Sequence, residues 1–241
     1  MQIKHIKIQE KPKGKRFAIG DIHGCSKTFK TLVEDKVQLT KDDHLFLLGD
    51  YIDKGLDSIG VLDYILYLKE SGFQVFPLMG NHEYNLLEAK ERYNERTFKR
   101  FLRINKNQNI VDEQMNIKPR YQRFLESLPY YYELEDYHLV HAGFDFRKEN
   151  PFQDFQAMLY IRRFEVKKEL LQGKKIIHGH TPTPLSNIRQ SISSNASVIP
   201  LDNGCIYTKP HKMFDYKTLG NLCCLDLDSL NLAVQRNIEN K

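Results

Sequence analysis

The sequence has no apolar run near the ~18 residues that a membrane-spanning helix needs, so we expect no membrane partner. The segment before residue 16 is basic but lacks the apolar core of a secretory signal, which favours a cytoplasmic protein. The formal net charge is only +5. This mild positive charge suits an anionic substrate, but it is too diffuse to indicate nucleic-acid binding, so we expect no nucleic-acid partner.

Cysteine is scarce, and its spacing excludes the usual structural roles. The four cysteines lack the paired spacing of zinc sites; they are Cys25, Cys205, Cys223 and Cys224. We interpret them as buried free thiols in a reducing compartment. The chain is 41% hydrophobic and 28% charged, which is ordinary for a globular protein, and its 241 residues are enough for a large core.

Three short apolar segments, residues 16–20, 45–48 and 73–79, read as buried strands that end at glycine. The polar residues that follow are Asp21 and His23, then Asp50 and Asp53, then Asn81 and His82. The three strand ends recur about every 30 residues, the length of a βαβ unit. Parallel strands would therefore bring these side chains to one edge of a sheet.

Two further apolar segments, residues 137–140 and 174–177, end in His141 and in His178 and His180. Each motif alone has an ordinary structural explanation. Asp21 could cap a helix over residues 26–37, Asp50 and Asp53 could stabilise a turn, and a lone histidine is more often a core residue. Five strand ends with the same chemistry favour a metal site instead, because carboxylate and imidazole together suit a divalent transition metal.

The remaining pattern frames these strand ends. Apolar periodicity predicts a helix over residues 58–69. A polar helical stretch over 83–109 and a second helix over 118–127 are expected to form a cap over the sheet edge. Residues 132–135 and 137–140 read as a hairpin or strand entry, and 221–227 with 230–234 as a closing hairpin. Residues 183–197, rich in Ser, Asn and Pro, are predicted to be a mobile loop at the rim of the site.

Together these motifs resemble the ordered signature of calcineurin-like metallophosphoesterases, and more narrowly the phosphoprotein phosphatase branch that includes bacterial and lambda phage protein phosphatases. The matching segments are Gly20-Asp21-Ile22-His23-Gly24, Gly49-Asp50-Tyr51-Ile52-Asp53-Lys54-Gly55, Gly80-Asn81-His82-Glu83, His141-Ala142-Gly143 and Gly179-His180-Thr181. The turn Leu201-Asp202-Asn203-Gly204-Cys205 also fits, both for these enzymes and for symmetrical diadenosine tetraphosphatases. The resemblance implies an α/β fold, a four-layer α/β/β/α sandwich, as a single domain over residues 1–241 with a helical cap insert at roughly 84–130.

The resemblance also implies roles for individual residues. The expected ligands of two divalent metal ions are Asp21, His23, Asp50, Asn81, His141 and His180, with Asp50 bridging both ions. Manganese is the first choice, and iron, zinc, nickel or cobalt are alternatives. His82 would be the general acid, held by Asp53, while His178 lies outside the matched motif and is interpreted as structural or supporting.

Two cations are expected at the substrate phosphate. Lys54 stands where the family pattern has arginine, so one point charge replaces a two-pronged contact. Arg162, in the segment 158–164, matches the phosphate-binding arginine of bacterial members, although a surface arginine on a helix is an alternative.

The first functional hypothesis is a phosphomonoesterase that cleaves phosphoserine or phosphothreonine by direct attack of a metal-bridging hydroxide. The expected partner is then a phosphorylated protein or a small phosphoester. The alternative on the same scaffold is a symmetrical dinucleoside polyphosphate hydrolase, such as a diadenosine tetraphosphatase. A third hypothesis, a catalytically inactive binding module, is disfavoured because every expected ligand is present. The sequence does not indicate the oligomeric state.

Overall fold

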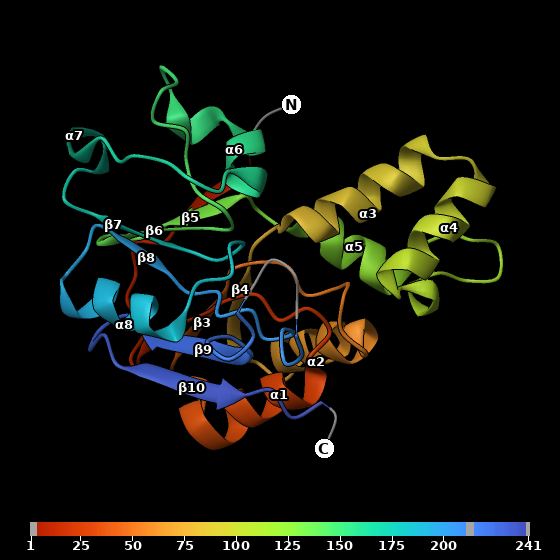
Figure 1. The fold of residues 1–241 in the computed structure, drawn as a ribbon, viewed down its shortest axis with the longest axis horizontal. Helices are drawn as coiled ribbons and strands as arrows, with labels where there is room; N and C mark the ends of the chain where they lie inside the picture. The colour runs from red at the N-terminus through yellow and green to blue at the C-terminus, as the bar shows by residue number, and fades with distance from the viewer. Residues whose placement is uncertain (1–3, 211–214, 240–241) are drawn as a thin grey trace.

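The computed structural model describes residues 4–210 and 215–239, and in these it forms two five-stranded sheets flanked by helices (Figure 1). The first sheet has the strand order β10-β9-β2-β3-β4. Its members are β2 (Arg16–Ile19), β3 (His44–Leu47), β4 (Gln74–Pro77), β9 (Asn221–Asp226) and β10 (Leu232–Arg236). The three predicted central strands run parallel, and β9 and β10 form the predicted closing hairpin.

The second sheet has the strand order β1-β5-β6-β7-β8. Its members are β1 (His5–Lys7), β5 (Tyr131–Glu133), β6 (Tyr137–Val140), β7 (Lys175–His178) and β8 (Val198–Pro200). Strands β5 and β6 form an antiparallel hairpin, whereas β6, β7 and β8 are parallel. The sequence analysis did not identify β1 and β8, because three residues are too few for a recognisable alternation.

The two sheets face each other across an apolar layer, which confirms the predicted α/β/β/α sandwich. Successive side chains of a strand point to opposite faces of its sheet, so each strand contributes to two apolar clusters. Ala18 and Phe46 point into the layer between the sheets, where they lie in one cluster with Leu139 and Ile177 of the second sheet. The opposite side chains of the first sheet pack under α1 (Ser26–Thr31) and α2 (Ser58–Glu70). The outer face of the second sheet packs under η3 (Pro151–Gln153) and α6 (Phe155–Tyr160).

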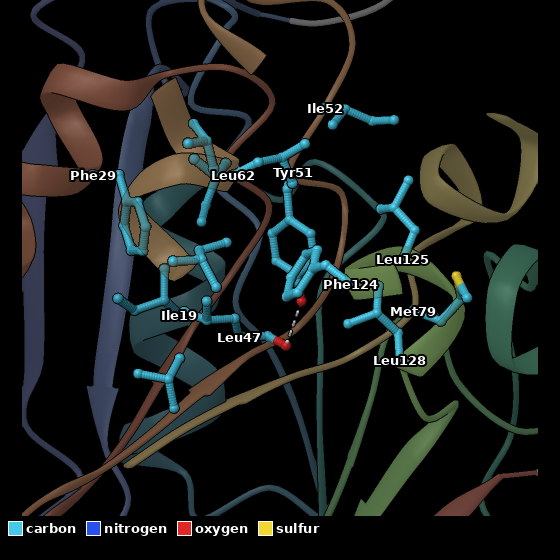
Figure 2. Packing of buried hydrophobic residues seen from close by; sticks show 14 of the residues in the cluster. Ile19, Phe29, Leu47, Tyr51, Ile52, Leu62, Met79, Phe124, Leu125 and Leu128 are labelled. Carbon is cyan, nitrogen blue, oxygen red and sulfur yellow. Dashed lines mark hydrogen bonds between the residues drawn. The ribbon is translucent and has the colours of Figure 1, made fainter. Parts of the chain in front are cut away.

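Tyr51 anchors the loop that follows β3. Figure 2 shows its ring between apolar side chains of α2 and those of α5 (Pro119–Ser127), including Leu62 and Phe124. The Tyr51 hydroxyl donates to the carbonyl oxygens of Leu47 at 3.2 Å and Leu78 at 2.7 Å. Because the ring is fully buried and its polar tip is satisfied, the polar residues on either side of it are held in place.

The segment predicted as a cap forms three helices, which project from the sheets in Figure 1. They are α3 (Asn81–Arg92), α4 (Glu95–Asn105) and α5 (Pro119–Ser127), with a short η2 (Gln108–Ile110) between the last two. The single helical stretch predicted over 83–109 is wrong, because the chain breaks at Asn94. Its side chain accepts from the backbone N–H of Thr97 at 3.0 Å and so begins a new helix.

The predicted mobile loop over 183–197 is also wrong, since residues Leu185–Ser193 form the helix α8. Ile188 is fully buried, and Leu185 and Ile192 lie on the same face and pack against the layer between the sheets. Serine and asparagine on the exposed face masked this period in the sequence. The helix predicted over 26–37 begins correctly, but it continues after α1 as the π-helical segment η1 (Leu32–Val37).

A short helix α7 (Lys168–Leu171) completes the elements. Among the residues that the structure describes, the helices are too short or too polar to cross a membrane.

Candidate metal centre

The parallel register brings the predicted strand ends to one edge of the two sheets. In the described part of the chain, two groups of potential ligands have their ligand atoms within 4.8 Å of one another. One group is His23, Asp50 and His82, and the other is Asp50, His141 and His180. Asp50 belongs to both groups, which is the arrangement expected of a carboxylate shared by two ions.

The ligand segments have unusual backbone conformations. Five residues here have positive φ angles although they are not glycine: His23 (46°), Asp50 (54°), Asp53 (68°), Lys54 (64°) and His180 (65°). Such conformations cost free energy and persist where the surroundings fix them, typically at functional sites. Gly49 has a φ of 97°, and a Cβ there would lie 2.7 Å from the Gly80 Cα. Glycine therefore permits the close approach of two ligand loops.

Asn81 joins the second group from the start of α3. Its Oδ1 lies 3.0 Å from His141 Nε2 and 2.9 Å from His180 Nδ1. His141 Nδ1 donates to the Leu48 carbonyl at 2.8 Å, so in the neutral ring Nε2 carries a lone pair. Burial lowers the pKa of His141 and keeps the ring neutral. His141 Nε2 and Asn81 Oδ1 thus both present lone pairs to each other, and a cation bound by both atoms would satisfy them.

His180 completes this group and supports the same conclusion. Burial lowers its pKa to about 3, so the ring is neutral at physiological pH. Its Nε2 is buried and has no hydrogen-bond partner. A buried, unpaired nitrogen with a lone pair is unfavourable unless it binds a ligand. The donor set of the second group therefore fits a divalent metal ion.

In the first group, the ammonium group of Lys54 lies next to the ring nitrogen of His23 that would bind a metal ion. His23 Nδ1 donates to the Ile52 carbonyl at 2.9 Å, which leaves Nε2 as the acceptor. Lys54 Nζ lies 2.7 Å from that Nε2, and Asp50 Oδ2 lies 3.4 Å from it. Asp21 Oδ2 is 3.9 Å away. The ammonium group shows that a cation can lie beside this imidazole nitrogen.

The buried carboxylates show the same need for positive charge. Burial, together with the charges of Asp202 and Asp50, raises the pKa of Asp21 well above its usual range. Burial alone would also raise the pKa of Asp50, but the neighbouring imidazoles, His141 first, hold it low. Burial raises the pKa of Asp202 to about 6. Carboxylates crowded in this way are stabilised in their charged form by bound cations. The N-cap position of α1 is Cys25, so Asp21 does not cap that helix.

His82 and Asp53 form the predicted pair at the exposed side of the site. His82 Nδ1 lies 2.5 Å from Asp53 Oδ2, and its Nε2 lies 3.8 Å from Asp50 Oδ2. Burial opposes the protonated form of His82, but the charge of Asp50 and the hydrogen bond that His82 Nδ1 donates to Asp53 raise its pKa overall. The side chain is 17% exposed, so its free nitrogen can reach a substrate.

Two residues that the sequence analysis missed support this edge. Glu83 is fully buried, and its carboxylate accepts from the backbone N–H groups of Asp50, Tyr51, Ile52 and Gly80. Asn107, which follows α4, donates to the second oxygen of Asp53. Glu83 lay inside a quoted motif but had no assigned role, and nothing in the local sequence of Asn107 pointed to the site.

Arg162 follows the end of α6 in an extended, exposed segment, so it is not a surface arginine on a helix. The Arg162 charge contributes to the low pKa of His180 and opposes the rise in the pKa of Asp202, so it acts electrostatically on the centre. His178 is buried against the Phe164 ring, with centroids 5.6 Å apart, and its Nδ1 contacts the Gly179 carbonyl at 3.0 Å. These contacts are those of a supporting residue.

The comparisons with known proteins agree with this geometry. The bis(5′-nucleosyl)-tetraphosphatase, symmetrical, of Buchnera aphidicola (from Schizaphis graminum) is 33% identical over 100 residues, 40% of this chain and 36% of the relative. The protein of that name from Wigglesworthia glossinidia brevipalpis is 42% identical over 71 residues, 30% of this chain and 25% of the relative. The matches thus cover only a quarter to about a third of these relatives.

Solved structures extend the similarity of fold to the whole chain. A structure assigned as a diadenosine tetraphosphatase superimposes with a TM-score of 0.67 at 18% identity, over 99% of this chain and 100% of that one. A protein serine/threonine phosphatase from Saccharomyces cerevisiae superimposes with a TM-score of 0.62 at 15% identity, over 99% of this chain and 85% of the other. At such identities the likeness shows the fold alone. The calcineurin-like phosphoesterase family matches residues 15–216, which include all the candidate metal ligands, and the chain belongs to that family.

Proposed function

We propose that this protein is a metal-dependent hydrolase of dinucleoside polyphosphates, acting on the phosphoanhydride bond near the middle of the substrate. The observation that carries the hydrolase assignment is the position of Asp50 in both ligand groups. The substrate assignment rests on the names of the two relatives, both symmetrical tetraphosphatases. Protein phosphatase activity was the first hypothesis from the sequence, and these relatives favour the alternative instead.

Six residues would hold two divalent ions. Asp21 and His23 would hold one ion, Asn81, His141 and His180 the other, and Asp50 both. When bound, such a pair supplies Lewis-acid stabilisation of the charge that develops in an in-line displacement at phosphorus. The chain contributes neutral imidazoles, fixed in tautomer by the carbonyls of Ile52 and Leu48, so that the nitrogens facing the centre carry lone pairs.

The cations of the chain would bind the substrate. Lys54 and Arg162 would neutralise phosphate oxygens that the ions do not bind, and they would orient the phosphorus for attack. His82 can donate a proton to the leaving group, and Asp53 holds the imidazole in position at 2.5 Å. A nucleoside diphosphate is a stable leaving group, so it needs this proton less than an alcohol does.

The His82–Asp53 pair is the observation that favours a second candidate, phosphomonoester hydrolysis. An alkoxide leaving group requires a proton in the transition state, and a histidine with a raised pKa is suited to supply it. Serine or threonine phosphoesters would then be cleaved by the same centre. The two candidate functions would use the same metal ligands and differ only in the leaving group.

A substrate panel tests the proposal. The protein is freed of metal with a chelator, reconstituted with Mn²⁺ and supplied in parallel with diadenosine tetraphosphate, a phosphoserine peptide and p-nitrophenyl phosphate. We expect kcat/KM for diadenosine tetraphosphate to exceed that for the peptide, with ADP as the product. A preference for the peptide would replace the proposal by its second candidate, and activity that survives excess chelator would contradict both.

A further inference from the structure

We infer that a cavity beside the metal centre binds one nucleoside diphosphate half of the substrate; this inference rests on the proposed function and extends it. The cavity, called here the lysine pocket, has a volume of about 440 Å³. The lining includes Lys54, Leu56, Lys106, Ile206, Tyr207, Lys209 and Glu239. Cavities that bind small molecules in proteins are typically ~300–1,000 Å³, so a nucleotide-sized ligand fits here.

The lysine pocket is continuous with the metal centre through two residues. Lys54 lines the pocket and also approaches the candidate metal ligand His23 at 2.7 Å. Tyr207 lines it from the opposite segment of the chain, and the charges of Lys54, Asp202 and Arg162 all influence its pKa. A phosphate chain held at the centre can therefore extend past these residues without leaving the protein surface.

The charges of the pocket suit the phosphates of such a ligand. Lys106 lies at the end of α4 and donates from Nζ to the Lys54 carbonyl at 2.9 Å, so its ammonium group lies beside the Lys54 backbone. Lys209 also lines the pocket and adds positive charge. Of the lining residues that the structure describes, only Glu239 is acidic, and one of its oxygens accepts from the backbone N–H and the hydroxyl of Thr28 at 2.8 Å. The pocket thus has a net positive charge.

The remaining lining suits a base and a ribose. Leu56 is 65% exposed, and Ile206 is partly exposed, although both lie beside a polar centre. The Tyr207 ring packs against Gly204, where an added Cβ would lie 2.6 Å from Cδ2, so the aromatic face is held in place. Apolar and aromatic surface next to lysines is the combination that binds a nucleotide, whereas inorganic phosphate has no base or ribose to place in this pocket.

The experiment measures inhibition as well as turnover. ADP and inorganic phosphate are tested as inhibitors of p-nitrophenyl phosphate hydrolysis by the Mn²⁺-loaded protein and by two variants, Lys106→Gln and Leu56→Glu. Leu56 is exposed, so Leu56→Glu places a negative charge in the pocket without disturbing the core. We expect the inhibition constant of ADP to rise about tenfold in each variant, because one charge contact is lost or opposed, while that of phosphate stays within twofold.

Lys99→Gln is the matched control, since Lys99 is an exposed lysine of the same helix that does not line the pocket. ADP and phosphate should inhibit this variant as they inhibit the wild type, and it should hydrolyse both substrates at wild-type rates. In parallel, KM for diadenosine tetraphosphate should rise about tenfold in Lys106→Gln and Leu56→Glu, with hydrolysis of p-nitrophenyl phosphate unchanged. A selective effect of this kind cannot come from loss of folding.

The outcomes separate the pocket from the proposed function. If ADP inhibits no better than phosphate, or equally well in all four proteins, the pocket does not bind nucleotide. If p-nitrophenyl phosphate hydrolysis falls as much as ADP binding does in both variants, these residues only support the Lys54 loop and the inference is wrong. If the wild type does not cleave diadenosine tetraphosphate but ADP inhibition still depends on both residues, the proposed function fails and the nucleotide pocket stands.

Discussion

The carboxylate of Glu83 accepts a hydrogen bond from the backbone N–H of Asp50, with Oε2 2.9 Å from the nitrogen. The same oxygen accepts from Gly80 at 3.1 Å, and Oε1 accepts from Tyr51 and Ile52 at 2.8 and 3.2 Å. One buried side chain at the start of α3 therefore fixes two of the loops that carry candidate metal ligands. The position of Asp50 is therefore fixed by the buried side chain of its neighbour Tyr51 and by the hydrogen bond of its own backbone N–H to Glu83.

Replacing Glu83 tests this support. In Glu83→Gln one acceptor oxygen becomes an NH₂ group that faces N–H donors, so buried donors lose their partner. We expect the free energy of unfolding to fall by roughly 1–3 kcal/mol and Mn²⁺ affinity to fall as well. Urea unfolding and metal titration measure both. Glu91→Gln, on the exposed face of the same helix, is the control, and equal stability of the two variants would contradict the role of Glu83.

The sequence predicted the arrangement of the strand ends better than it predicted their surroundings. The repeated spacing of strand, glycine and acid indicated that Asp21, Asp50 and Asn81 would share one sheet edge, since parallel register leaves little freedom. Asn107 was not predictable in the same way. Its contact with Asp53 joins residues 54 positions apart, and it depends on how the helix break at Asn94 aims α4 back towards the site. Local pattern carries no information about such a direction.

Helix α8 shows a different limit of sequence reasoning. Its apolar residues have helical spacing, but serine and asparagine fill the other face, and these residues favour turns when propensity alone is considered. Burial of Ile188 against the sheets overrides that preference. Tertiary contacts of this kind decide short helices, because most helical stability in proteins comes from packing.

Removal of the shared ligand gives the most direct test of the metal centre. Asp50→Asn should bind fewer than two Mn²⁺ ions per chain and should lose activity, because Asp50 belongs to both ligand groups. Asn81→Ala should lower the affinity for one ion more than for the other, because Asn81 belongs to only one of the two ligand sets. Metal content by elemental analysis after equilibrium dialysis measures the difference. Two tightly bound ions in Asp50→Asn would exclude a bridging role for that carboxylate.

The proton donor can be tested through the leaving group. His82→Asn should lower kcat for a phosphoserine peptide by ~10²–10⁴-fold, the usual range for loss of a general acid. The loss should be smaller for p-nitrophenyl phosphate and for diadenosine tetraphosphate, whose leaving groups are stable anions. Steady-state kinetics on all three substrates give the comparison, with metal content as the control because His82 lies near Asp50. Equal losses on every substrate would mean that His82 positions other groups and donates no proton.

The two cations at the substrate should differ in strength. A charge-assisted contact to phosphate contributes ~1.5–3 kcal/mol, so removing one should lower kcat/KM by roughly 10- to 150-fold. Arg162→Ala should be more damaging than Lys54→Ala, because a guanidinium makes two parallel contacts with phosphate and an ammonium makes one. Lys54→Arg should be tolerated and should strengthen inhibition by inorganic phosphate. The measurement is kcat/KM with phosphate inhibition for the three variants, and Arg163→Ala, the exposed neighbour, serves as the control.

Unchanged phosphate inhibition in Arg162→Ala would show that this arginine does not reach the substrate. An inactive but folded Lys54→Arg would show that the loop after Asp53 requires lysine at its contact with His23, 2.7 Å away, rather than at phosphate.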